Sequence, residues 1–371
     1  MTESPMTEPP RSGGPLYGLR VIELGGIGPL PFFAMLLADM GADVVTIDSP
    51  SGSVRKPDLL RSGRRTLSLD LKNPEQLDVV QRLVSAADIF AEPFRPGVAE
   101  RLGLGPDQCR ARNDRLIYVR MAGWGRGGTL DATPGYDINF LALSGVLSAV
   151  GSWEGPPVPP LNLVGDFGGG AVLAVGVLSA LIERAASGRG QVVDGSILDG
   201  ASLLATAIHS FRAQGTWVDE RGHNIVDSGA PYYGVYETSD RKFVAIGAVD
   251  RRLFQSVLDR LGTTASASDP LDRSCWADLH VAIENAVRQR TRDEWAEEFA
   301  AQGCLTPVLS FDEAIEHPHN RARSAFVGTP EMRPSPTPRL SRTPAIAKGP
   351  ERAIEAAELI DEWTQNGETH R

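Results

Sequence analysis

The first fifty residues restrict the fold more than any other stretch. Residues 19–24 have the pattern of a buried strand, residues 32–40 that of a helix, and residues 42–47 that of a second strand. This order forms a βαβ unit, in which the two strands are parallel and the crossover is right-handed. We therefore expect an α/β fold with a parallel sheet. Further strands are expected over 66–71, 88–92, 116–120 and 191–197.

A dinucleotide-binding fold begins in the same way. Asp48 stands at the end of the second strand, where such folds keep an acidic residue for the ribose. Their phosphate-binding fingerprint needs glycine at three positions. Gly26 and Gly28 match the first two, whereas Pro31 occupies the third. The mismatch argues against a nicotinamide cofactor.

Asp166 is the most conspicuous candidate for chemistry. Three glycines follow it, and an apolar helix is expected over 171–182. An aspartate in this place often caps the helix, because its oxygens accept amide hydrogens of the first turn. Glycines also let a ligand approach the backbone, and the amino end of a helix favours negative charge. The alternative to a structural cap is therefore a catalytic carboxylate beside an oxyanion site at Gly168 and Gly169.

The composition of the chain argues against several classes of protein. The 371 residues allow two or three domains, and the net charge of −10 argues against nucleic-acid binding, which needs a basic face. The three cysteines fit neither zinc-ligand nor disulfide spacing, so we expect no metal and a cytoplasmic location. Glycines and Glu183 interrupt the apolar run after Asp166, which favours a buried helix over a membrane span. Residues 1–14 read as a disordered leader.

Basic side chains gather at or just after the ends of the expected strands. In open α/β sheets, ligands bind outside the carboxyl ends of the strands. These side chains are interpreted either as contacts for the phosphates of an anionic ligand or as solvated surface residues. They are Arg64, Lys72, Arg95 and Arg101.

Several motifs together resemble the family III CoA-transferase superfamily, and within it the α-methylacyl-CoA racemase branch. They include Gly18-Leu-Arg-Val-Ile-Glu-Leu24, Phe94-Arg-Pro-Gly97, Tyr136-Asp-Ile-Asn139, Asn162-Leu-Val-Gly-Asp-Phe-Gly-Gly-Gly170 and Gly229-Ala-Pro-Tyr-Tyr233. The resemblance implies a large Rossmann-like domain built from both chain ends, a small α+β domain and an interlocked homodimer. The implied parts are a large CoA-binding domain over 15–197, a helical linker over 198–227, a small domain over 228–315, a return linker over 316–335 and a completing segment over 336–371.

The resemblance also implies the substrate and the site. The substrate would be an acyl-CoA thioester, with no separate cofactor. The racemase branch uses a His and an Asp on opposite faces of the α-carbon, and a Glu that orients the His; here these positions hold Tyr136, Asp166 and Asp250. The family often has an arginine for a phosphate where this chain has Ser49, so Arg61, Arg64 or Arg65 is the expected substitute. The implied CoA contacts are Ile27, Arg64, Asp70, Lys72, Arg95, Arg101 and Asp137.

Tyr136 leaves the reaction open. A phenol has a pKa of about 10 against about 6.5 for an imidazole, so it donates a proton more readily than it removes one. A tyrosine here is also common in the transferase branch, where the residue equivalent to Asp166 attacks the thioester. The glycines after Asp166 resemble the racemase branch. We therefore expect a racemase or epimerase of 2-methylacyl-CoA, with a CoA transferase or a non-catalytic acyl-CoA-binding protein as alternatives.

Overall fold

The computed structural model describes residues 13–52, 56–266, 272–328 and 330–365. They form two compact units. The large unit contains the described residues up to Ser144, Leu161–Leu204 and the described residues from Arg323 onward. The small unit contains Gly145–Pro160 and Ala205–Ala322. The predicted leader lies almost wholly outside the described residues.

The stretch Gly145–Pro160 belongs to the small unit, although the sequence prediction placed it in the large domain. Arg221 accounts for the difference. Its guanidinium donates hydrogen bonds to the carbonyl oxygens of Ser148, Ser152 and Gly155, which hold the stretch to a loop of the small unit. A contact between residues so far apart along the chain leaves no local pattern in the sequence.

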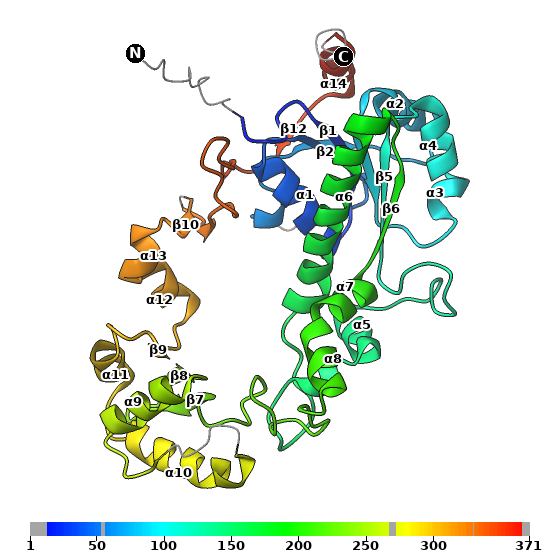
Figure 1. The fold of residues 1–371 in the computed structure, drawn as a ribbon. Helices are drawn as coiled ribbons and strands as arrows, with labels where there is room; N and C mark the ends of the chain where they lie inside the picture. Colours follow the sequence, from blue (N-terminus) through cyan, green and yellow to red (C-terminus); the bar gives the residue numbers. More distant parts are fainter. Residues whose placement is uncertain (1–12, 53–55, 267–271, 329, 366–371) are drawn as a thin grey trace, which may run out of the picture. The chain divides into compact units, whose positions relative to one another are not determined.

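A seven-stranded parallel sheet is the framework of the large unit, as predicted (Figure 1). Its order is β12-β3-β2-β1-β4-β5-β6. The chain proceeds outward from β1 in one direction and then returns to build β4 on the other side of β1, so a topological switch point lies between β1 and β4. The strands are β1 (Arg20–Leu24), β2 (Asp43–Asp48), β3 (Arg65–Ser68), β4 (Ile89–Glu92), β5 (Ile117–Ala122), β6 (Val192–Ser196) and β12 (Arg352–Ala353).

Helices cover both faces of this sheet. On one face α1 (Pro29–Asp39) and α6 (Gly168–Ser187) bury their apolar side chains against Val21 and Val44. On the other face Ile22, Val45 and Phe90 form a second core. Neighbouring residues of a strand point to opposite faces, which is why these strands carry apolar side chains toward both faces. The second core includes side chains of α2 (Pro74–Ala86), α4 (Pro106–Arg112) and α14 (Ala356–Gln365).

The small unit contains a three-stranded antiparallel sheet, β7 (Tyr233–Glu237), β8 (Phe243–Gly247) and β9 (Leu305–Pro307). Its core packs Tyr236 and Val244 against helical residues such as Phe254. Capping boxes begin α11 and α12, as their sequences predict. The helices of this unit are α8 (Thr206–Ala213), α9 (Arg251–Leu261), α10 (Trp276–Val287), α11 (Arg292–Glu298), α12 (Phe311–Glu316) and α13 (Pro318–Ala322).

The long apolar helix begins one turn earlier than predicted. A π-helical turn, Leu163–Phe167, runs directly into α6, and Phe167 is the residue that precedes the α-helix. The capping interpretation of Asp166 is therefore wrong, since Asp166 lies inside the helical run. By length and composition alone Leu163–Ser187 could cross a membrane, but Leu173 and Val177 lie in the core beside the sheet.

Candidate functional site

The carboxylate of Asp166 lies against the loop that follows β1. Gly28, at the end of this loop, precedes α1 and has φ +72°, a left-handed conformation that favours glycine. A Cβ atom at Gly28 would lie 2.8 Å from Oδ2 of Asp166. Glycine is therefore required at this position for two independent reasons. The loop lies at the carboxyl edge of the sheet, beside the switch point, where ligands bind in such folds.

Two polar partners hold Asp166 in place. Its backbone N–H donates to Oδ1 of Asp137 at 2.9 Å, and the Asn162 amide donates to its Oδ2 at 3.3 Å. Asp137 is the first residue of α5 (Asp137–Ser144), so this contact ties α5 to the π-helical turn. A Cβ at Gly165 would lie 2.1 Å from Oδ1 of Asp137, which explains the glycine before Asp166. π-Helical turns are frequent at functional sites.

The surroundings of Asp166 make it a stronger base than an exposed aspartate. Burial raises the pKa of the Asp166 carboxyl, the Asn162 hydrogen bond lowers it, and the nearby charge of Asp137 raises it, with an upward net result. Burial also raises the pKa of Asp137 against the hydrogen bond from the Asp166 amide. A carboxylate with a raised pKa accepts a proton from carbon more effectively.

The predicted oxyanion site at Gly168 and Gly169 is not formed. The N–H of Gly168 already donates inside the helix, toward the carbonyl oxygens of Leu163 and Gly165. Gly169 is buried, and a Cβ there would contact the Met121 side chain and the backbone of Ile197. The physical reason is the earlier start of the helix, which places these amides past its first turn. The glycines instead allow α6 to pack closely against neighbouring segments.

Tyr136 and Asp250 lie in different units of the chain. Tyr136 precedes α5 with its side chain 71% exposed, and its backbone N–H donates to the Asn139 side chain. Asp250 caps α9, where its Oδ1 accepts the N–H groups of Arg252 and Leu253. The orientation of Tyr136 by Asp250 thus stays a prediction.

Exposed aliphatic side chains on the π-helical turn and on the elements that contact it form what we call an apolar rim. The π-helical turn contacts α1, α5 and α7 (Ile197–Leu204), and each of these elements or its adjoining loop exposes large aliphatic side chains. Such a surface suits an apolar group bound next to the carboxylate. The exposed residues are Ile27, Ile138, Leu143, Leu161, Leu163, Leu203 and Leu204.

Arg64 does not face a ligand. Its side chain is buried, pairs with Oε2 of Glu23 at 2.8 Å and donates to the carbonyl oxygens of Leu60 and Pro31. Thr46 donates to the same Glu23 oxygen at 2.7 Å. The expectation that Arg64 binds CoA is therefore wrong, because a carboxylate of the protein already neutralises it inside the core.

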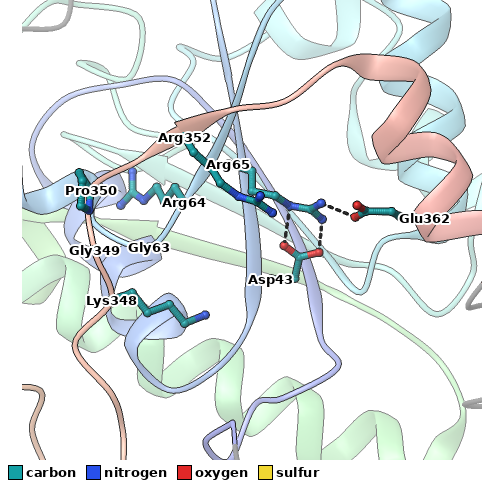
Figure 2. A pocket seen from close by; sticks show the side chains of 9 residues that line it. All are labelled: Asp43, Gly63, Arg64, Arg65, Lys348, Gly349, Pro350, Arg352 and Glu362. Atoms are coloured by element: carbon teal, nitrogen blue, oxygen red, sulfur yellow. Dashed lines mark hydrogen bonds and ion pairs between the residues drawn. The ribbon is translucent and has the colours of Figure 1, made fainter.

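The two neighbouring arginines are also occupied. Arg61 pairs with Asp48 and Glu351, and Arg65 pairs with Asp43 and Glu362. Neither therefore replaces the phosphate contact missing at Ser49. Figure 2 shows the Arg65 pairs in a cavity of about 420 Å³ at the amino-terminal ends of β2, β3 and β12. This cavity lies at the opposite edge of the sheet from Asp166 and Gly28, since the strands are parallel.

Three of the predicted CoA contacts are exposed cations. Lys72, Arg95 and Arg101 form no ion pair with any part of the chain that the structure describes. Arg101 reaches over Gly97, where a Cβ would lie 3.1 Å from Nη1. Asp70 accepts the backbone N–H of Lys72 and thereby shapes the turn after β3. Ile27 is exposed beside Gly28. The binding of CoA by these residues remains a prediction.

The sequence analysis missed Asn162 and Gly28 as site residues. Asn162 lies four positions before Asp166, the spacing of neighbours on one helix face, so a signal was present. Gly28 enters the sequence prediction only as part of a dinucleotide motif. Among the described residues, no group of three or more His, Cys, Asp or Glu side chains is arranged to hold a metal ion.

Comparison with known proteins identifies the family. Residues 16–357 match the model of CoA-transferase family III. The chain is 42% identical to alpha-methylacyl-CoA racemase of Mus musculus and 40% identical to that of Homo sapiens, each over 336 residues that cover 89% of this chain and 88% of the relative. The crystal structure of a CAIB/BAIF family protein from Brucella suis matches with a TM-score of 0.81 at 25% identity, covering 95% of this chain and 100% of that one. The chain therefore belongs to CoA-transferase family III.

Proposed function

We propose that this protein is a racemase or epimerase that moves the α-proton of a 2-methylacyl-CoA thioester, with Asp166 as its base. The observation that carries the proposal is the Asp166 carboxylate, half-buried and held by Asn162 beside Gly28 within an apolar rim. The relatives that are 40–42% identical are named alpha-methylacyl-CoA racemase, which supports the same reaction.

The reaction balances through an enolate. Asp166 takes the proton from the α-carbon, and the electron pair of the C–H bond becomes the C=C bond of the enolate while the thioester oxygen gains negative charge. The hydroxyl of Tyr136 then donates a proton to the opposite face of the α-carbon, and the carbonyl group re-forms. Asp166 finally releases its proton to solvent and Tyr136 takes one up from solvent. The reverse direction requires tyrosinate as the base, and a phenol donates a proton more readily than it removes one. Because the two epimers have nearly equal free energies, kcat/KM for inversion is the same in both directions, and the weak basicity of a phenol slows both.

We propose that exposed cations hold the CoA portion. Lys72 follows β3, and Arg95 and Arg101 follow β4, all at the carboxyl edge of the sheet. Phosphates bind favourably to lysine and arginine side chains that no carboxylate neutralises. The apolar rim around Asp166 would then receive the acyl group.

We also propose a homodimer. The outward face of the small-unit sheet exposes Val235, Phe243 and Val308, and Phe311 beside it is also exposed. Exposed apolar side chains gathered on one sheet face are typical of an interaction surface. A second copy of the chain is the proposed partner, and light scattering of the purified protein would measure twice the mass of one chain.

One incubation tests the reaction. The enzyme is mixed with a single epimer of a 2-methylacyl-CoA in D2O, and the product is examined for mass and stereochemistry. Deuterium at the α-carbon together with loss of chirality is the expected result. Absence of both, with CoA still bound, would overturn the proposed reaction.

A CoA transferase is the second candidate, and Tyr136 favours it, because a tyrosine at this position resembles the transferase branch. In that reaction an Asp166 oxygen attacks the thioester carbonyl, CoA leaves as the thiolate, and a mixed anhydride forms on the aspartate. Hydroxylamine would then trap the acyl group and leave a hydroxamate at Asp166. Trapping without α-deuterium would establish this candidate in place of the racemase.

Replacing Tyr136 separates inversion from exchange. In Tyr136→Phe the second proton donor is absent, so inversion should fall by about 10²-fold or more. Exchange of the α-proton through Asp166 should continue with retention. Tyr136→His should restore or increase inversion, because an imidazole serves as both acid and base near neutral pH. Inversion by Tyr136→Phe at the wild-type rate would remove Tyr136 from the mechanism.

Asp137→Asn should change the pH dependence. The charge of Asp137 raises the pKa of Asp166, so its removal lowers that pKa. Asp166 acts as a base only when ionised, and the acid limb of the kcat/KM profile for α-deuterium incorporation should therefore move to lower pH. Asparagine keeps an oxygen for the Asp166 N–H, so the site geometry is preserved. An acid limb that stays at the same pH or moves to higher pH would contradict the effect of the Asp137 charge on the pKa of Asp166.

A further inference from the structure

Glu92 is a fully buried carboxylate that the proposed mechanism does not use. It is the last residue of β4 and stands immediately before the turn of residues 93–97, which carries Arg95. Burial raises its pKa to about 7, against hydrogen bonding and nearby arginines that lower it. A buried charge is tolerated only where donors face it. The hydrogen-bond donors that face Glu92 therefore identify the segments that this carboxylate holds in place.

Glu92 contacts two loops, the turn of residues 93–97 after β4 and the loop of residues 123–128 after β5. Its Oε2 accepts the N–H of Phe94 at 2.6 Å, which fixes the turn after β4. Its Oε1 accepts a hydrogen bond from Nη2 of Arg126 at 3.1 Å. Arg126 belongs to the glycine-rich loop of residues 123–128 that follows β5. One carboxylate thus joins the two loops that leave the sheet at its carboxyl edge.

Arg126 depends on this contact. Its side chain is 14% exposed, and the next carboxylate, Asp194 on β6, lies 4.0 Å from Nε. Within the described part of the chain, Nε has no hydrogen-bond acceptor. If Glu92 became neutral, Arg126 would lose the negative charge of its shortest ion pair.

Other titratable groups surround Glu92. Arg120 of β5 lowers its pKa and Glu100 of α3 (Val98–Arg101) raises it, and these two residues form an ion pair at 3.1 Å. Cys109 and Tyr118 also face the carboxylate, but burial raises the pKa of the thiol to about 12 and that of the phenol further still. The thiol and the phenol therefore stay neutral while Glu92 changes its charge.

We propose that Glu92 is a positioning residue for CoA: ionised, it holds both loops in the arrangement that presents Arg95 to the phosphates, and protonation releases Arg126 and weakens binding. The inference rests on the proposed function for the identity of its ligand. Its consequence is a CoA affinity that is highest above neutral pH and decreases as the pH falls through about 7, the range in which Glu92 takes up its proton.

Calorimetric titration of the whole protein with CoA and with 3′-dephospho-CoA, from pH 5.5 to 8.5, tests this. The second ligand is needed because a phosphate monoester itself titrates near a pKa of about 6. For wild type, we expect Kd for both ligands to increase about tenfold between pH 8 and pH 6, the weight of one charge-assisted hydrogen bond. Glu92→Gln should bind CoA at every pH with the weak affinity of wild type at pH 6, because it has no charge and its amide N–H₂ replaces one of the two oxygens that accept from Phe94 and Arg126.

Glu100→Gln is the matched control. It removes a carboxylate of the same cluster, paired with Arg120 at the same distance, that makes no contact with Phe94. This variant should keep tight CoA binding at pH 8 and a decrease of affinity at lower pH, with the midpoint moved to lower pH because Glu100 no longer raises the pKa of Glu92. Tight binding by Glu92→Gln at pH 8, or a pH dependence that survives in it for dephospho-CoA, would overturn the inference. Failure of wild type to bind CoA at any pH would instead overturn the proposed function.

Glu92→Gln should remain folded, so its effect on binding is interpretable. A carboxyl whose pKa is higher in the folded state stabilises the fold most below its unfolded pKa, and that contribution is lost as the pH rises through about 7. At pH 8 the neutral amide avoids the cost of a buried charge. The melting temperature of Glu92→Gln at pH 8 should equal or exceed that of wild type, and a lower value would contradict the assignment of Glu92 as a costly buried ion.

Discussion

Asp166→Asn should abolish incorporation of α-deuterium from D2O, with kcat reduced by about 10³-fold or more, the range for loss of a positioned general base. Asparagine has the shape of aspartate, so the packing against Gly28 and the amide contact to Asp137 are retained. What is lost is the ability to accept a proton. Mass spectrometry of the recovered thioester measures the exchange directly.

The effect should be confined to the chemical step. CoA affinity should be unchanged, because the proposed phosphate contacts at Lys72, Arg95 and Arg101 are separate residues. Asp78→Asn is the matched control, since Asp78 is an exposed aspartate of α2, away from the π-helical turn, and it should behave as wild type. Exchange by Asp166→Asn within tenfold of wild type would assign the base to another residue and leave Asp166 with a structural role.

The parallel sheet and its helices were predictable because their signals are local. Apolar runs bounded by glycine mark the strands, and Asn73 with Pro74 marks the start of α2 as the structure has it. Asp166 was singled out by the glycines that follow it at the head of an apolar helix. The place of Asp166 inside a π-helical turn was not predictable. Such a turn differs from a helix cap only in backbone geometry and has no sequence pattern of its own.

The pairing of charged residues was not predictable from their own surroundings. Arg61, Arg64 and Arg65 read as a cationic cluster, but each binds a carboxylate that is distant along the chain. The sequence around Glu23, the ion-pair partner of Arg64, did indicate a buried pair. Glu23 stands inside the apolar strand Arg20–Leu24, and an acid in such a strand needs a buried cation or donor nearby. A search for unpaired acids in buried strands would have predicted an internal role for one of the three arginines.

Arg64→Met should destabilise the large unit by about 3–5 kcal/mol, the cost of leaving one member of a buried ion pair without its partner. Both side chains of the Glu23–Arg64 pair are inaccessible to solvent, and Oε1 of Glu23 has no donor among the described residues. Methionine fills much of the volume but removes the charge and the hydrogen bonds to Leu60 and Pro31. Urea denaturation at pH 8 measures the loss as a lower midpoint.

The pH dependence of this loss identifies its cause. Burial already raises the pKa of Glu23 against the influence of Arg64, and without Arg64 it rises further. A raised pKa in the folded state gives stability that is present below the unfolded pKa and lost as the pH rises. The deficit of Arg64→Met should therefore be smaller at pH 5 than at pH 8, and Glu23→Gln combined with Arg64→Met should recover much of it at pH 8. An equal deficit at both pH values, unrelieved in the double variant, would mean that lost packing rather than the uncompensated carboxylate destabilises the fold.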